Sequence, residues 1–118
     1  MLTSKSTTVV AALCTFILLP AVAAARRSPD KKRTQYIRSN YTKFEYRIPM
    51  RDGARLFTAV YLPNDRSKKF PILLLRTPYR AGPYGADRYR TPLGPSEDFE
   101  KSGYIFVFQD VRGRFMSE

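Results

Sequence analysis

Serine hydroxyls are the nucleophiles that this sequence offers, and no histidine accompanies them to act as a base. None of the serines considered stands in a Gly-x-Ser-x-Gly sequence, the sharp strand-to-helix elbow that exposes a nucleophilic serine. Without histidine, the chain can neither complete a Ser–His–Asp triad nor form a histidine metal site. The serines considered are Ser28, Ser39, Ser67, Ser96, Ser102 and Ser117.

Tyr79 and Asp110 are the polar residues whose position in the sequence favours a binding site. Each closely follows a strongly apolar run of residues, which is typical of a buried strand. In open α/β sheets, ligands bind outside the carboxyl ends of the parallel strands. Tyr79 could contact a ligand there or simply pack against the sheet. For Asp110 we favour a structural role, in which its carboxylate anchors its own loop by pairing with Arg112 or Arg114.

Two strands joined by a tight turn are predicted upstream of these residues. Phe44, Tyr46 and Ile48 alternate with charged residues, as in a strand with one buried face. The Arg-Asp-Gly sequence at 51–53 is typical of a turn, because glycine readily adopts positive φ. A second β-rich run covers residues 56–62. The pattern therefore predicts an antiparallel β-hairpin.

A different kind of strand is predicted at 70–75 and again at 104–108, where every position or nearly every position is apolar. Such runs are typical of strands covered on both faces, as in a parallel sheet between helices. Ser96 and Gly103 are expected to bound a short helix between them. A strand–helix–strand crossover gives a parallel pair. The expected fold class is α/β, with an antiparallel β-hairpin followed by a parallel strand–helix–strand unit.

The segment at 80–95 is expected to be a long loop, because glycine and proline interrupt it repeatedly. Loops of this length in a domain are usually functional or disordered. Its tyrosines and arginines could line a substrate entrance, or they could form an aromatic and basic surface for nucleic acid. We favour the first reading and expect no nucleic-acid partner, since no known nucleic-acid-binding module is present.

Several segments, in series, resemble one group of hydrolases. They are the turn Met50-Arg51-Asp52-Gly53, the motif Arg76-Thr77-Pro78-Tyr79, and the run from Gly103 to Arg114 that contains Gln-Asp-Val-Arg-Gly-Arg. Together they resemble the cocaine-esterase/NonD hydrolases, a group similar to X-prolyl dipeptidyl aminopeptidases and α-amino-acid ester hydrolases. The resemblance covers residues 43–118.

The resemblance implies an α/β-hydrolase fold and acyl transfer by a Ser–His–Asp triad, with an ester, an amide or a peptide as substrate and without cofactor or metal. It also implies that Tyr79 is the tyrosine that helps to form the oxyanion hole. The family's nucleophile follows the segment that ends at Arg114. We therefore expect residues 43–118 to be an incomplete, N-terminal portion of a serine hydrolase domain, inactive on its own.

The N-terminal segments are predicted to lie outside that domain. Residues 1–25 have the pattern of a secretory signal peptide, with Lys5, an apolar stretch at 9–22 and alanines at 23–25. The apolar stretch is short for a membrane span, which needs roughly 20 apolar residues. We therefore expect a secreted or periplasmic protein without a stable membrane anchor. Residues 26–42 are expected to form a basic flexible linker.

The charge of the chain leaves one alternative open. The formal net charge is +11, and a strongly basic protein can bind anionic surfaces. The alternative is a small secreted basic protein that binds such surfaces through residues 26–38. Against it, runs of like charge are commonly solvated tails.

Overall fold

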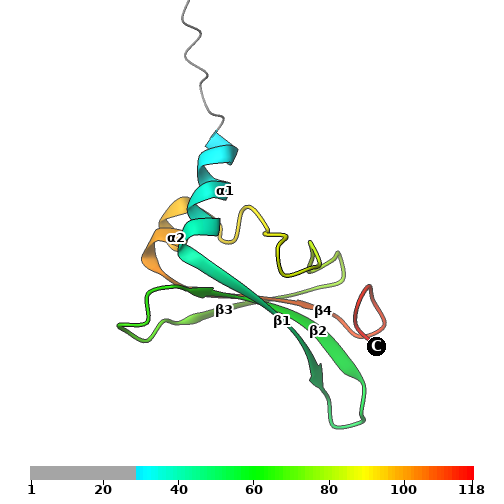
Figure 1. Cartoon of the computed structure of the whole chain (residues 1–118). Helices are drawn as coiled ribbons and strands as arrows, with labels where there is room; N and C mark the ends of the chain where they lie inside the picture. The colour runs from blue at the N-terminus through cyan, green and yellow to red at the C-terminus, as the bar shows by residue number, and fades with distance from the viewer. Residues whose placement is uncertain (1–28) are drawn as a thin grey trace, which may run out of the picture.

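A four-stranded mixed sheet carries two helices and a long loop on one of its faces (Figure 1). The structure is a computed structural model that describes residues 29–118, so the signal-peptide prediction for 1–25 falls outside the described residues. The elements in chain order are α1 (Pro29–Asn40), β1 (Tyr41–Pro49), β2 (Arg55–Pro63), β3 (Ile72–Thr77), α2 (Glu97–Ser102) and β4 (Ile105–Asp110).

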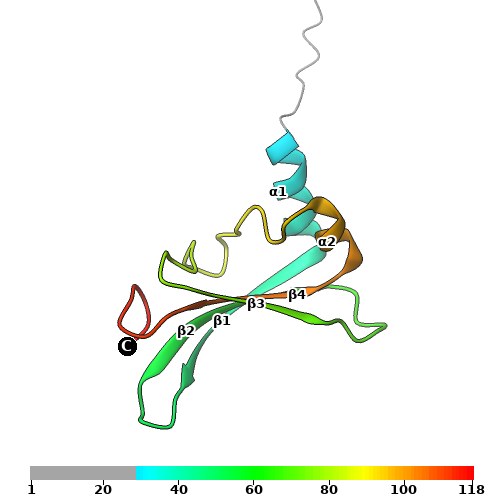
Figure 2. The same ribbon diagram turned by 180° about the vertical axis from the view of Figure 1, so that it is seen from behind.

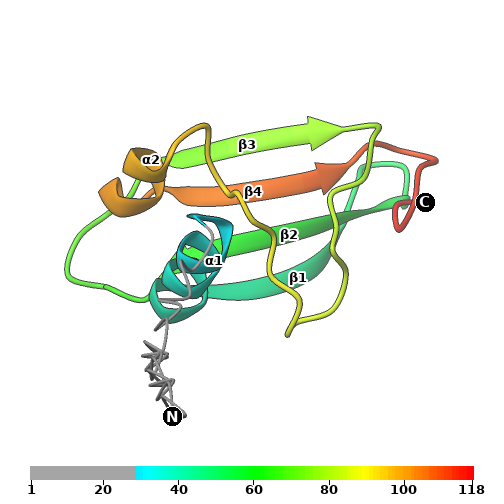
Figure 3. The same ribbon diagram turned by 90° about the horizontal axis from the view of Figure 1, so that it is seen from above.

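The strand order is β1-β2-β4-β3, which Figure 3 shows from above. The β1–β2 hairpin is antiparallel and the β3–β4 pair is parallel, so both predictions of strand pairing are confirmed. β4 lies between β2 and β3 and runs antiparallel to β2. The pairing of β3 with β4 places Thr77 opposite Asp110, at the carboxyl ends of both strands.

The turn between β1 and β2 forms where the sequence predicts it. The backbone N–H of Gly53 donates to the carbonyl of Met50 at 3.0 Å, and the N–H of Met50 donates to the carbonyl of Ala54 at 2.8 Å. Gly53 has φ of +87°, a conformation that costs glycine no steric strain.

The apolar core lies between the sheet and the elements above it. Tyr61, Phe106 and Phe108 point from the sheet into this core, where Ile37 of α1 and Leu93 of the long loop meet them. The Tyr61 and Phe108 rings pack edge to face with centroids 5.8 Å apart. Figure 2 shows from behind that α1, α2 and the loop all lie on this one side.

The segment 26–42, which we expected to be a flexible linker, contains α1 and the first residues of β1. Two contacts hold the helix on the sheet. Ile37 is fully buried in the core, and Arg33 forms a bidentate ion pair with Glu100, with N–O distances of 2.8 and 2.9 Å. A helix this short is marginal alone in water, so tertiary packing stabilises it. Local sequence does not show such contacts, which explains the difference.

The opposite face of the sheet is not covered by any element in residues 29–118 (Figure 1). Ile72 and Leu74 of β3 are 64% and 56% exposed, and Tyr46 of β1 is 51% exposed. The prediction that β3 is buried on both faces is therefore not met by the described part of the chain.

α2 lies where Ser96 and Gly103 predict a short helix. Ser96 is the N-cap residue in extended conformation, although its side chain makes no capping hydrogen bond. Gly103 ends the helix with φ of +81°, and a Cβ atom there would lie 2.6 Å from the Phe70 ring. No helix within residues 29–118 is long and apolar enough to cross a membrane.

Candidate active site at the carboxyl ends of the parallel strands

Tyr79 projects from the carboxyl end of β3 into solvent. It lies two residues beyond Thr77, the last residue of the strand, and it is 88% exposed. Its backbone N–H donates a hydrogen bond of 3.0 Å to the hydroxyl of Thr77, which is a buried residue. The backbone of Tyr79 is thus fixed to the sheet while its side chain remains available for contact.

Asp110 ends the neighbouring strand β4 and is fully buried. One carboxylate oxygen accepts the backbone N–H of Ala81 at 2.6 Å, and the other accepts the hydroxyl of Tyr84 at 2.8 Å. The prediction that Asp110 pairs with Arg112 or Arg114 is wrong in its partners. The carboxylate chiefly anchors the loop after β3, and its own loop reaches it only through a longer contact of 3.5 Å from the Met116 N–H.

The guanidinium of Arg112 pairs with a different carboxylate. It forms a bidentate ion pair with Asp52 in the β1–β2 turn, and both side chains are more than half exposed. The pairing holds the pKa of Asp52 below its usual value, chiefly through the hydrogen bond from Arg112. This pair ties the loop after β4 to the β1–β2 turn, and exposed pairs of this kind contribute little to stability.

Arg80 connects the two anchored points around Tyr79 in a strained conformation. Its φ is +96°, a region that non-glycine residues rarely occupy. Such a conformation costs on the order of 1–3 kcal/mol and persists only where the surroundings enforce it. The surroundings here are the hydrogen bonds of Tyr79 to Thr77 and of Ala81 to Asp110.

Tyr84 is the second side chain that contacts Asp110. Burial, followed by the hydrogen bond to Asp110, raises the pKa of Tyr84 to about 12, so the phenol remains a protonated donor at neutral pH. Its ring packs edge to face on Phe57 at 4.9 Å between centroids, and the Arg80 guanidinium lies 5.1 Å from the ring centre. Tyr84 therefore joins the loop after β3 to both β4 and β2.

A buried lysine fixes the next part of the same loop. The Lys43 side chain is fully buried, and its ammonium donates to the carbonyls of Pro83, Gly85 and Arg88 at 2.6 to 2.9 Å. It also forms an ion pair with Glu45 at 2.6 Å. The long loop is consequently held at two places, by Asp110 near its start and by Lys43 in its middle.

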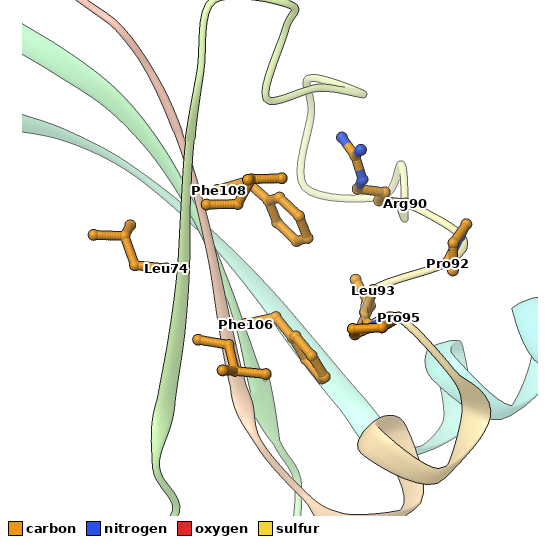
Figure 4. Close-up of a pocket in the computed structure, with 10 residues that line it drawn as sticks. Leu74, Arg90, Pro92, Leu93, Pro95, Phe106 and Phe108 are labelled. Atoms are coloured by element: carbon orange, nitrogen blue, oxygen red, sulfur yellow. The ribbon is translucent and has the colours of Figure 1, made fainter.

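An apolar cavity of about 360 Å³ lies between the loop and the β3–β4 pair (Figure 4). The rings of Phe106 and Phe108 point into it, and Arg90 stacks over Phe108 at 4.6 Å from the ring centre. The lining residues are Leu73, Leu74, Leu75, Arg90, Pro92, Leu93, Gly94, Pro95, Phe106 and Phe108. Tyr79 is not among them, so the cavity and the candidate site are separate features.

The described serines have structural contacts or lie apart from Tyr79. The Ser117 hydroxyl accepts the N–H of Phe57 at 2.8 Å and donates to the Asp110 carbonyl at 2.9 Å. The Ser102 hydroxyl donates to a carbonyl of its own helix. Ser39 lies in α1, Ser67 lies in the loop before β3, and Ser96 directly precedes α2. Ser28 lies outside the described residues. Within residues 29–118, no group of three or more side chains could hold a metal ion.

Sequence reasoning placed Tyr79 and Asp110 at neighbouring strand ends, and the structure brings their loops together. The roles of Tyr84 and Lys43 were missed. Tyr84 lies 26 residues from Asp110 along the chain, and Lys43 lies 40 to 45 residues from the carbonyls that it binds. The alternation in β1 predicts the wrong face for Lys43, because it places the lysine on the charged side of the strand. In the structure that side is buried at Lys43, whereas Phe44, Tyr46 and Ile48 are 37–51% exposed. No local signal exists for the Tyr84 contact.

Comparison with known proteins agrees with the resemblance in the sequence. A family model described as X-Pro dipeptidyl-peptidase (S15 family) matches residues 52–118. The cocaine esterase of Rhodococcus sp. (strain MB1 Bresler) is 39% identical over 71 residues, which are 60% of this chain and 12% of the esterase.

Two solved structures are similar to this chain. An aminopeptidase from a marine sediment Thaumarchaeota archaeon matches 67% of this chain and 14% of its own, with 38% identity and a TM-score of 0.52. An α-amino acid ester hydrolase labelled with selenomethionine matches 85% of this chain and 17% of its own, with 35% identity and a TM-score of 0.53. The chain thus spans less than a fifth of the length of the relatives it matches.

Proposed function

The chain belongs to the X-Pro dipeptidyl-peptidase (S15) family, and from this premise we propose that it contributes the N-terminal part of a serine hydrolase domain. The domain cleaves ester or amide bonds, including peptide bonds, by acyl transfer. The relatives are named as an esterase, an ester hydrolase and an aminopeptidase, and these activities support this reaction class. The hairpin and the parallel pair form the first four strands of an α/β-hydrolase sheet in this proposal.

Tyr79 is proposed as one donor of the oxyanion hole. Attack on a carbonyl creates a tetrahedral intermediate with negative charge on the former carbonyl oxygen. A phenol hydroxyl can donate a hydrogen bond to that oxygen. The exposed position of Tyr79 at the carboxyl end of β3 carries this assignment, because such strand ends are where open α/β sheets bind ligands.

The other catalytic groups are not assigned to residues of this chain. A histidine base is required for the usual triad, and the chain contains none. The second oxyanion donor would be the backbone N–H that follows the nucleophile in its elbow. This chain's part in the chemistry is therefore to place one neutral donor where charge develops.

A hybrid enzyme tests the proposal. Residues 43–118 replace the matching segment of the Rhodococcus cocaine esterase, and hydrolysis of a p-nitrophenyl ester is measured. We expect Tyr79→Phe to lower kcat by about 10²–10³, the usual cost of losing one oxyanion donor. The matched control is Tyr104→Phe, which removes a phenol hydroxyl at the opposite end of the parallel pair and should leave kcat within about twofold.

Equal activity of the parent hybrid and its Tyr79→Phe variant would remove the oxyanion assignment. The 118-residue chain alone serves as the blank, and we expect no hydrolysis above buffer because it has no histidine.

Export of the protein is also a proposal. The pattern of residues 1–25 supports cleavage before Arg26 and a secreted or periplasmic location. N-terminal sequencing of the protein recovered outside the cytoplasm tests the cleavage. A product that begins at Met1 would contradict it. Binding to anionic surfaces through the basic segment is less favoured, because Arg33 is paired with Glu100 and Arg38 donates to the Asp87 carbonyl at 3.4 Å.

A further inference from the structure

We infer that Asp110 is a positioning residue for Tyr79: its buried carboxylate holds the loop after β3 in the conformation that presents the phenol. This inference deepens the proposed function and rests on it. It assigns Asp110 no contact with the substrate. The role is to fix the backbone that carries the oxyanion donor.

The backbone that carries Tyr79 is fixed on both sides. On one side of the span, the Tyr79 N–H is bound to the Thr77 hydroxyl at 3.0 Å, and Thr77 is part of β3. On the other side, the Ala81 N–H is bound to Asp110 at 2.6 Å, and Asp110 is part of β4. Only Arg80 lies between these two bonded residues, so the direction of the Tyr79 side chain is set by the strands.

The two strands that carry these anchors are paired beneath the loop. Thr77 and Asp110 are register partners in the parallel pair, and the Val111 N–H donates to the Thr77 carbonyl at 3.2 Å. Both anchors therefore belong to one hydrogen-bonded unit. A buried carboxylate is suited to such a position, because charge-assisted hydrogen bonds to ionised acceptors are shorter and stronger than neutral ones.

The backbone at Arg80, between the two anchors, is strained. A residue with a side chain adopts φ of +96° only under constraint, and strained residues cluster at functional sites. If the loop were free, Arg80 would relax to negative φ and Tyr79 would change direction. The Asp110–Ala81 hydrogen bond opposes that relaxation.

Tyr84 closes the network on the side facing the core. Its hydroxyl occupies the second oxygen of Asp110 at 2.8 Å, and a longer contact of 3.5 Å comes from the Met116 N–H. Both oxygens of the carboxylate are thereby used within the protein. The carboxylate is positioned to hold backbone and is not left open for a ligand.

Amide hydrogen exchange on the full 118-residue chain tests the hold on the loop. Asp110→Asn removes the negative charge and leaves one acceptor oxygen in place of two, so the hydrogen bond from the Ala81 N–H loses its charge assistance. We expect the Ala81 amide to exchange at least ~10-fold faster. Tyr84→Phe keeps the carboxylate that accepts the Ala81 N–H, so we expect a smaller increase in the exchange rate of Ala81. This variant serves as the test if Asp110→Asn unfolds the chain. An unchanged Ala81 exchange rate in a folded Asp110→Asn protein would overturn the inference.

Glu100→Gln is the matched control for a buried carboxylate. Glu100 is 1% exposed and accepts the N–H groups of Leu93 and Gly94 at 2.8 and 3.2 Å. We expect this variant to speed exchange at Leu93 and Gly94 and to leave Ala81 unchanged. Faster exchange at all three amides in both variants would indicate general loosening and would also overturn the inference.

The catalytic readout uses the hybrid esterase. Asp110→Asn should lower kcat by about tenfold with KM unchanged, and by less than about twofold when Tyr79→Phe is already present, since residues acting as a unit are non-additive. Equal losses in both backgrounds would overturn the positioning role alone. A hybrid that keeps its kcat with Tyr79→Phe would instead overturn the proposed function.

Discussion

Single buried charges hold the long loop to the sheet, and Lys43 is the clearest example. Its ammonium is bound by three backbone carbonyls and by Glu45. We expect Lys43→Met to lower the free energy of unfolding by about 3 kcal/mol, because removing one partner leaves the buried oxygens unsatisfied. Urea denaturation of the full chain measures the change.

Lys101→Met is the control for that substitution. Lys101 pairs with Glu97 at i,i+4 on an exposed helix surface, at 3.2 Å. Exposed pairs of this kind contribute about 0.3–0.5 kcal/mol. Equal losses in the two variants would contradict a special role for the buried ammonium.

Glu100 should make stability depend on pH in the acid range. Burial alone would raise the pKa of Glu100, but the hydrogen bonds from Arg33, Gly94 and Leu93 outweigh it, and the pKa lies below its usual value. A carboxyl whose pKa is lowered by folding stabilises the fold above its unfolded pKa, about 4.3 for Glu. That stability is lost as the pH falls through the lowered folded-state pKa.

Urea unfolding at a series of pH values from 7 to 3 measures this effect. We expect the free energy of unfolding of the parent to fall below about pH 4.3 more steeply than that of Glu100→Gln, which cannot titrate. Glu97→Gln, on the exposed side of α2, should follow the parent. Parallel curves for the parent and Glu100→Gln would contradict the linkage.

The partners of individual side chains are the features that the sequence predicts least well. Asp110 was placed at the correct strand end, but its partners were expected among neighbouring arginines. In the fold, Arg112 reaches Asp52 in another turn, and Asp110 is reached by Ala81 and Tyr84. Those partners are set by strand register and loop path, which spacing along the chain does not encode. The proposed role of Tyr79 came from the family resemblance.

At the scale of elements, periodicity predicted the strands and missed one helix. Alternation in β1 and continuous apolar runs in β3 and β4 gave the hairpin and the parallel pair. α1 was expected to be a linker because it is strongly polar. It is helical because Ile37 enters the core and Arg33 pairs with Glu100 across 67 residues of sequence. Contacts of that separation are invisible to a local window.

At the scale of the whole molecule, the exposed sheet face should govern solution behaviour. Ile72, Leu74 and Tyr46 lie on that face, more than half exposed, and β3 is an edge strand of the described sheet. Exposed apolar faces and unpaired strand edges promote association. We expect the average mass of the full chain in sedimentation velocity to rise with concentration, and Leu74→Lys to reduce the rise.

Ser67→Lys is the control, because it adds the same charge in an exposed loop and not on the sheet face. It distinguishes the effect of added charge from the effect of changing that face. It should leave the concentration dependence close to that of the parent. A constant single-chain mass for the parent at all concentrations would contradict the expectation.

The strand order also has a consequence for synthesis on the ribosome. Within residues 29–118, β3 has only β4 as a sheet neighbour, because β4 lies between it and β2. Residues 78–104, 27 residues, separate β3 from β4. At about 5–20 residues per second, β3 therefore waits about 1.4–5.4 s for its partner. During that interval its leucines are exposed in a nascent chain whose hairpin can already form. This segment is therefore where a holding chaperone would be expected to engage.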